Sequence, residues 1–138
     1  IALCIYLARK ARKGMPVDDI RHRIERDFGY DLSMCVEELR PWYSWNGLDE
    51  AENGGMCQGS VPQAIICALD ATDSEDAVRN AISIGGDSDT IGCITGSIAE
   101  ALYAIPGDIR QKGMSYLPRE FKAVIENFEA IFGSDKNR

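Results

Sequence analysis

Gly85-Gly86-Asp87-Ser88-Asp89-Thr90 stands in the middle of a long stretch of helix-forming residues, SVPQAIICALDATDSEDAVRNAISIGGDSDTIGCITGSIAEALYAIP, at positions 60–106. The glycine pair lets the backbone turn tightly after one helix, and two carboxylates with a hydroxyl then stand at the start of the next. Carboxylate and hydroxyl oxygens are hard ligands, which suit Mg²⁺, Ca²⁺ or Mn²⁺ rather than zinc or copper. The stretch therefore predicts two helices joined by a turn that can bind a divalent cation.

The same residues also allow a purely structural interpretation. Asp87 or Ser88 can act as the N-cap of a helix, and Asp89 in the first turn then interacts favourably with the helix dipole. Spacing alone leaves these two interpretations evenly matched. An EF-hand is excluded, because its next acidic position and its terminal glutamate would fall on Ile91 and Ile98.

Helical periodicity extends outward from this turn in both directions, and no run of alternating apolar and polar residues predicts a strand. We therefore predict an all-α chain with about six helices and no sheet. The six expected helices cover residues 1–13, 17–28, 60–69, 73–84, 88–104 and 118–132, and the sequence also allows a short one from 107 to about 112. The stripe expected to face inward on the last helix is Phe121, Val124, Ile125, Phe128 and Ile131.

The remaining parts of the chain carry weaker signals. Residues 30–59 are predicted to be mostly loop around a few aromatic anchors, and the tail 134–138 is expected to fray. Ser60 and Gln63 have the spacing of a capping box, so the third helix is expected to start at Ser60. Residues 1–138 otherwise read as a single domain, without an internal repeat or a dividing linker.

Composition restricts the partners and the compartment. The 138 residues are 45% apolar, and 15 Lys and Arg against 22 Asp and Glu give a net charge of -7. Without a basic block, nucleic acid is not an expected partner. Five cysteines without a C-x-x-C pair predict neither disulfides nor zinc but a reducing, cytoplasmic setting. Basic residues after the apolar residues 1–8 come too soon for a membrane span, so neither a signal peptide nor an anchor is predicted.

The stretch 60–106 closely resembles the C-terminal part of the ADP-ribosylglycohydrolase family, and DDIRHRIERDFGYDL at 18–32 resembles the family's preceding helices. The resemblance implies an all-helical fold with two Mg²⁺ ions in a cleft, where Mn²⁺ could replace them. It implies Asp87, Asp89 and Thr90 as metal ligands, on a turn formed by Gly85 and Gly86.

The activity implied by the resemblance is magnesium-dependent hydrolysis of the bond that joins ADP-ribose to a modified protein side chain or a related small molecule. The ions would orient the ribose hydroxyls and a water and stabilise charge at the anomeric carbon. The linkage and the catalytic residue stay unassigned.

The sequence departs from the family pattern in its first half. Family members also contain a G-D-x-x-G element, an acidic T-D-D-type cluster and a histidine-containing segment, and these 138 residues contain none of them. We therefore expect the C-terminal half of a domain, which starts inside a helix at Ile1 and is inactive alone. The alternative is a non-catalytic family member that serves as an interaction module. Exposed apolar faces, such as that of residues 1–8, predict self-association or a missing partner.

Secondary candidates surround the turn motif. Met56 and Ser60 are weak candidates for contact with the substrate, because a helix N-terminus after a glycine-rich loop favours phosphate. The aromatic residues Trp42, Tyr43 and Trp45 could stack on adenine, but we interpret them as packing anchors. His22 lies between two arginines and is predicted to be exposed. Nucleophilic catalysis by Cys57 or Cys93 is not expected, because no histidine partner is available.

Overall fold

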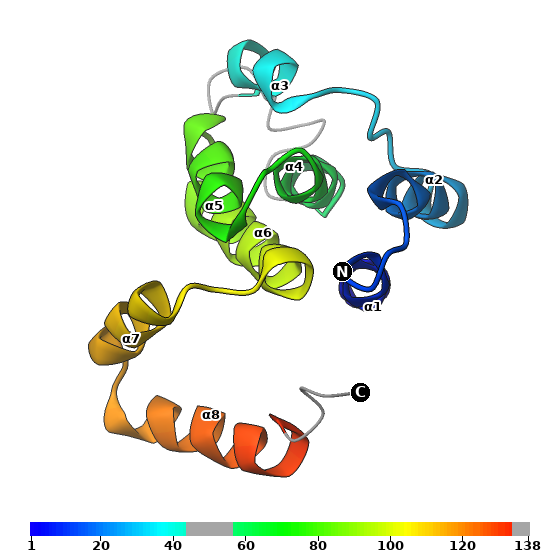
Figure 1. Ribbon diagram of the computed structural model, residues 1–138. Helices are drawn as coiled ribbons and strands as arrows, with labels where there is room; N and C mark the ends of the chain where they lie inside the picture. The colour runs from blue at the N-terminus through cyan, green and yellow to red at the C-terminus, as the bar shows by residue number, and fades with distance from the viewer. Residues whose placement is uncertain (44–56, 134–138) are drawn as a thin grey trace. The chain divides into compact units, whose positions relative to one another are not determined.

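The computed structural model describes residues 1–43 and 57–133, and these residues form eight α-helices and no strand (Figure 1). The all-α prediction is therefore confirmed, with more helices than the six or so expected. The helices are α1 (Ala2–Ala11), α2 (Val17–Phe28), α3 (Val36–Trp42), α4 (Cys57–Leu69), α5 (Ser74–Ser83), α6 (Ser88–Tyr103), α7 (Gly107–Tyr116) and α8 (Arg119–Phe132). None of them is long and apolar enough to cross a bilayer, as far as the described residues extend.

The chain divides into two compact units, Ile1–Ile105 and Pro106–Arg138. The first unit contains α1 to α6, and the second contains α7 and α8. The single domain expected over residues 1–138 stays a prediction.

Helix α4 is the centre of the first unit. All residues from Gly59 to Leu69 are buried, so every side of this helix is covered by other parts of the protein. Such complete burial is typical of a helix at the centre of a core. Figure 1 shows α4 end-on, between α5 and α6 on one side and α2 on the other. Helix α6 packs against α4, and the buried Thr95 hydroxyl donates a hydrogen bond to the Ala64 carbonyl at 3.0 Å. The two helices are thus fixed to each other by a polar contact as well as by apolar packing.

Helices α5 and α6 approach closely along a stripe of small residues. A Cβ atom at Gly92 would lie 3.7 Å from Ile82 Cδ1, and one at Gly96 would lie 3.9 Å from Val78 Cγ2. Helix α5 therefore packs against the small-residue side of α6.

Helix α3 corrects part of the prediction that residues 30–59 are mostly loop, whereas residues 44–56 of that range lie outside the described residues. Cys35 is its N-cap, and the Cys35 N–H donates to the Glu38 carboxylate at 2.9 Å, which forms a capping box. Cysteine is an unusual residue at this position, and Pro41 in the last turn reads as a helix breaker in the sequence. The helix signal was therefore hidden by two atypical residues.

The start of α4 corrects a second prediction. The helix already includes Cys57, so Ser60 lies within it and does not cap it. The burial of every residue from position 59 to 69 stabilises the helix, and this tertiary packing overrides the local capping-box pattern.

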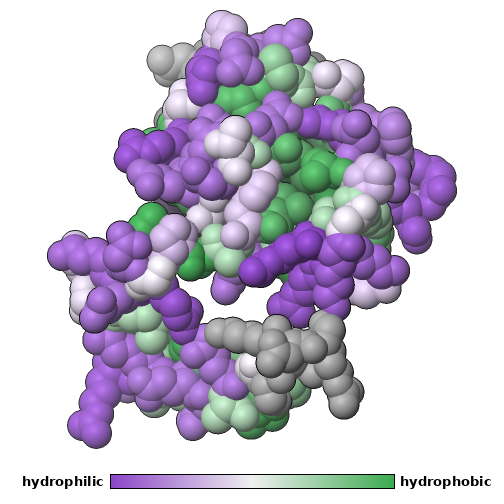
Figure 2. All heavy atoms as spheres, in the orientation of Figure 1, coloured by the Kyte–Doolittle hydropathy of each residue, from purple (hydrophilic) through white to green (hydrophobic). Residues whose placement is uncertain are grey.

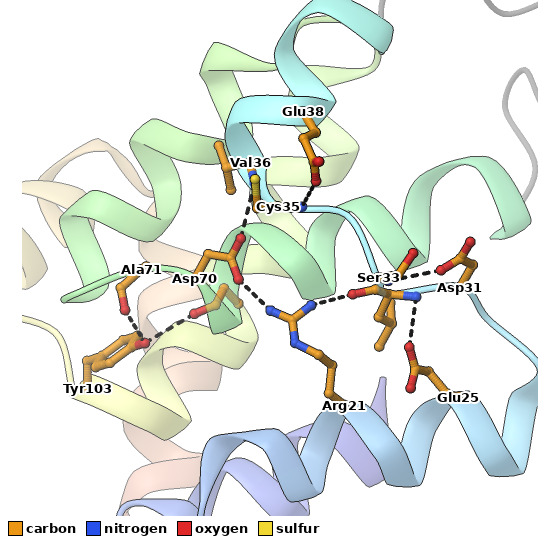
Figure 3. Close-up of polar contacts among 12 residues, drawn as sticks. Arg21, Glu25, Asp31, Ser33, Cys35, Val36, Glu38, Asp70, Ala71 and Tyr103 are labelled. Carbon is orange, nitrogen blue, oxygen red and sulfur yellow. Dashed lines mark hydrogen bonds and ion pairs between the residues drawn. The ribbon is translucent and has the colours of Figure 1, made fainter.

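A polar network connects the end of α4 with α2 and α3 (Figure 3). Asp70 follows α4 directly, and its carboxylate accepts hydrogen bonds from the Arg21 guanidinium and, at 3.1 Å, from the Val36 N–H. Arg21 also donates to the Leu32 carbonyl. The Arg21 and Asp70 side chains are only 21% and 19% exposed, so this ion pair is shielded from most of the solvent. The network fixes the first residue of α3 against the end of α4.

Within its described residues, 106–133, the second unit contains no buried core. Neither α7 nor α8 contains a buried residue, and an ion pair between Arg110 and Glu129 connects the two helices. Within the second unit, α7 does not cover the stripe expected to face inward on α8, because Phe121, Val124, Phe128 and Ile131 are 59–67% exposed and Ile125 is half-buried. The inward orientation of this stripe stays a prediction. A pair of helices this short cannot enclose its own apolar face.

We expect Asp70→Ala to lower the free energy of unfolding by about 2 kcal/mol, because it leaves Arg21 and the Val36 N–H without their acceptor. Urea denaturation followed by circular dichroism measures the change. Asp27→Ala is the control, since it removes an exposed carboxylate that pairs with Arg23 and Arg26 and should leave the midpoint almost unchanged. Equal shifts for both variants would contradict the structural role of Asp70.

Thiol labelling tests the core independently. Burial raises the pKa of the Cys4 thiol to about 11 and that of the Cys67 thiol to about 12, whereas Cys57 and Cys93 are exposed. N-ethylmaleimide should therefore modify Cys57 and Cys93 in the folded protein, and Cys4 and Cys67 only after unfolding. Peptide mass spectrometry measures the labelling. Modification of Cys4 and Cys93 at equal rates would contradict this packing.

Candidate metal centre

The turn that joins α5 to α6 contains two glycines in the left-handed region. Gly85 has φ 78° and Gly86 has φ 66°, values that a residue with a side chain rarely adopts. The Ser88 N–H donates to the Gly86 carbonyl at 2.9 Å, which closes the turn, and the Ile91 N–H donates to the Asp87 carbonyl at 3.0 Å, which opens α6. The backbone therefore changes direction within a few residues and brings Asp87 to the start of the helix.

The ring of Tyr43 also leaves no space for a side chain at position 86. A Cβ atom at Gly86 would lie 2.5 Å from Tyr43 Cε1, a distance that real Cβ atoms essentially never show. Tyr43 follows the last residue of α3 and is 2% exposed. Glycine at position 86 is thus required by both its backbone conformation and the aromatic ring against it.

Asp87 occupies the N-cap position of α6, but its carboxylate makes no capping hydrogen bond. By contrast, Asp73 is the N-cap of α5, and its carboxylate accepts a hydrogen bond from the Asp76 N–H at 2.8 Å. The purely structural interpretation of the motif accounts for the position of Asp87 but not for its side chain. Its carboxyl group, which is half-buried, interacts with Asp89 instead.

The carboxylates of Asp87 and Asp89 lie close enough to interact. A hydrogen bond from the Asp87 carboxyl lowers the pKa of Asp89, and the backbone N–H groups of Thr90 and Asp89 lower it further. Asp89 and Thr90 are exposed. Asp89 thus stays ionised below the usual pH range of an aspartate, and negative charge collects at the positive end of the α6 dipole. A divalent cation would take the place of the proton in the hydrogen bond between the two carboxyl groups.

The chemical type of the oxygen ligands in this turn suits a hard divalent cation. Asp87, Asp89 and Thr90 offer two carboxylates and a hydroxyl, the ligands that Mg²⁺ and Mn²⁺ prefer. Within residues 1–43 and 57–133, no group of three or more His, Cys, Asp or Glu side chains converges on one point. Since Mg²⁺ takes six oxygen ligands, water, substrate or other residues would have to complete the coordination.

Tyr43 and Ser60 form a buried support behind the turn. Burial raises the pKa of Tyr43, the negative charge of Asp87 raises it further, and a side-chain hydrogen bond with Ser60 acts in the opposite direction. Ser60 is 5% exposed. Residues from α3, α4 and the turn therefore meet at one place. The sequence identified Tyr43 only as a packing anchor, and its contact with Gly86 had no local signal beyond the glycine pair.

The other candidates lie apart from this arrangement or outside the described residues. Met56 and Trp45 belong to the latter group. Trp42 is 51% exposed, and its ring centroid lies 6.3 Å from that of Tyr43. His22 is exposed on α2, as predicted.

Comparison with known proteins gives the same family as the motif. The model of the ADP-ribosylglycohydrolase family matches residues 2–135. The chain is also 35% identical over 95 residues to a Danio rerio protein described as "ADP-ribosylhydrolase ARH3", and this alignment covers 61% of the chain and 23% of that relative. No solved structure matches the chain. Since the family model extends over nearly the whole chain and its helices, the chain belongs to the ADP-ribosylglycohydrolase family.

Proposed function

We propose that this chain supplies part of the magnesium site of an ADP-ribosylglycohydrolase. The complete protein would hydrolyse the glycosidic bond between ADP-ribose and a modified protein side chain or a related small molecule. The observation that carries the proposal is the Asp87 carboxyl group, which stands at the start of α6 without a capping hydrogen bond, in the same turn as Asp89. The family match and the printed name of the Danio rerio relative support the reaction class.

The metal ligands from this chain would be Asp87, Asp89 and Thr90. Bound Mg²⁺, for which Mn²⁺ could substitute, supplies positive charge that orients oxygen ligands and stabilises developing negative charge. A complete family site would hold two such ions. Gly85 and Gly86 fix the turn, so that the two carboxylates stand together before the cation arrives. Less conformational entropy is then lost when the cation binds.

Substrate contacts are proposed at Ser60, in the first turn of α4, and at Met56, which lies outside the described residues. Ser60 bonds to the buried Tyr43, so a contact with ADP-ribose would have to share its hydroxyl. The partners would be ADP-ribosylated proteins or ADP-ribosyl small molecules. The net charge of -7 disfavours nucleic acid, whose phosphates would be repelled.

Asp87→Ala combined with Asp89→Ala should abolish the stabilisation of the protein by Mg²⁺. In wild type, a ligand that binds only the folded state at 100 times its Kd adds about 2.7 kcal/mol. A thermal melt at increasing MgCl₂ measures this gain, and Mn²⁺ titration by electron paramagnetic resonance measures binding directly. We expect the double variant to lose at least about tenfold in affinity.

The neighbouring helix offers a matched control for this titration. Asp73→Ala removes an N-cap aspartate whose carboxylate does cap its helix, so it should cost about 1 kcal/mol of stability. Its response to Mg²⁺ should equal that of wild type. If the Asp87 and Asp89 double variant kept the wild-type titration, the ligand assignment would be wrong.

The 138 residues alone should release no ADP-ribose from an ADP-ribosylated protein. Two carboxylates and one hydroxyl cannot fill the coordination spheres of two magnesium ions. Chromatography of the released nucleotide measures the reaction, with an active ADP-ribosylglycohydrolase as positive control. Magnesium-dependent release by the pure chain would refute this prediction. A complete protein that binds Mg²⁺ but releases nothing would favour a non-catalytic family member.

A further inference from the structure

The ring of Tyr43 occupies the space that any side chain at position 86 would need. Its Cε1, Cδ1 and Cζ atoms lie 2.5, 3.2 and 3.3 Å from the position of a Cβ atom on Gly86. The Tyr43 carbonyl oxygen lies 3.9 Å from the corresponding position on Gly85. The ring therefore lies directly against the backbone segment that leads into Asp87.

The ring is fixed on its other sides. Tyr43 is 2% exposed, its backbone N–H donates to the Leu39 carbonyl at 2.7 Å, and its side chain bonds to Ser60. Ser60 belongs to α4, the helix that is buried on all sides. A side chain held by the core in this way has few alternative rotamers.

The helix that carries Tyr43 is attached at two further points. At its start, the Val36 N–H donates to Asp70 at 3.1 Å, next to the end of α4. In its middle, Arg40 donates to Ser83 Oγ at 3.0 Å and to Asn80 Oδ1 at 3.3 Å, both on α5. Ser83 is the last residue of α5, two positions before Gly85. Helix α3 thus connects the ends of α4 and α5 and places Tyr43 against the turn that follows.

From this geometry we propose that Tyr43 is a positioning residue for the metal turn. By holding Gly86 in its left-handed conformation, it keeps the Asp87 carboxylate beside Asp89, where both can bind one cation. The inference rests on the proposed metal role of these two aspartates. Its alternative is that Tyr43 only fills the core, in which case its loss lowers stability without a specific effect on the turn.

Three variants separate the two roles. Tyr43→Leu removes the ring, whereas Tyr43→Phe keeps the ring and loses only the hydroxyl. Tyr103→Leu is the control for lost stability, because Tyr103 is a partly buried tyrosine whose hydroxyl bonds to the Ala68 and Ala71 carbonyls near the other end of α6 (Figure 3).

The first measurement is amide hydrogen exchange of the metal-free protein. The informative amides are those of Gly85, Ser88 and Ile91, which donate hydrogen bonds within and next to the turn. We expect Tyr43→Leu to speed their exchange by roughly tenfold, Tyr43→Phe by less than about threefold, and Tyr103→Leu by no more than its global destabilisation predicts.

The second measurement is the Mn²⁺ affinity of the same proteins by electron paramagnetic resonance. Tyr43→Leu should weaken binding by about tenfold, while Tyr43→Phe and Tyr103→Leu should stay within about threefold of wild type. Wild-type exchange and affinity in Tyr43→Leu would overturn the proposal. So would an equal loss of affinity in Tyr103→Leu, which would reduce Tyr43 to a packing residue.

The proposal stays testable if wild type does not bind Mn²⁺ or if Tyr43→Leu does not fold. If wild type binds no Mn²⁺ through Asp87, the proposed function fails, but the exchange of the turn amides still decides whether Tyr43 positions them. If Tyr43→Leu does not fold, Gly86→Ala tests the same idea, because its Cβ atom would lie 2.5 Å from Tyr43 Cε1 and displace the ring. Gly85→Ala is its control, because it meets a similar backbone strain without contact with the ring. Gly86→Ala should speed exchange and weaken Mn²⁺ binding more than Gly85→Ala does, and equal effects of the two variants would overturn the proposal.

Discussion

The complete burial of α4 is the constraint on which the first unit depends. A helix with no exposed side from Gly59 to Leu69 must be surrounded, and α3, α5 and α6 pack directly against it while α1 and α2 belong to the same apolar core (Figure 1). Figure 2 shows where apolar side chains of this unit gather between the polar ones that cover its surface. Burial at about 25 cal/mol per Å² supplies the driving force for this arrangement.

Burial alone does not orient the helices around α4, and polar contacts do so at specific places. Thr95 attaches α6 to the middle of α4, and Asp70 attaches α2 and α3 to its end. Buried or partly buried polar groups lose much if their partners are displaced, so each of these contacts penalises other arrangements. The register of α3 along α4 determines where Tyr43 lies, and the turn before α6 depends on that position.

Local signals in the sequence predict those parts of the molecule that local interactions decide. The helix expected at 17–28 is α2, because its periodicity and Gly29 are local, and the same holds for the glycine turn at 85–86 and the start of α6. Helix α3 was missed because Cys35 is an uncommon N-cap residue and Pro41 in its last turn is typical of a helix end or a loop. The contact between Tyr43 and Gly86 joins distant positions through tertiary packing, which a single sequence does not reveal.

The two glycines of the turn differ in what restricts them, which becomes clear when the backbone conformation and the packing are considered together. A left-handed turn alone would require glycine at both positions, but only Gly86 has a ring 2.5 Å from the place of its missing Cβ atom. A small side chain at position 85 would meet backbone strain alone, whereas one at position 86 would also displace Tyr43 from Ser60 and α4. The ring of Tyr43 therefore contacts both the core helix α4 and the turn that leads into Asp87. The positions of the Asp87 and Asp89 carboxylates therefore depend on the packing of the whole first unit and not only on the six residues from 85 to 90.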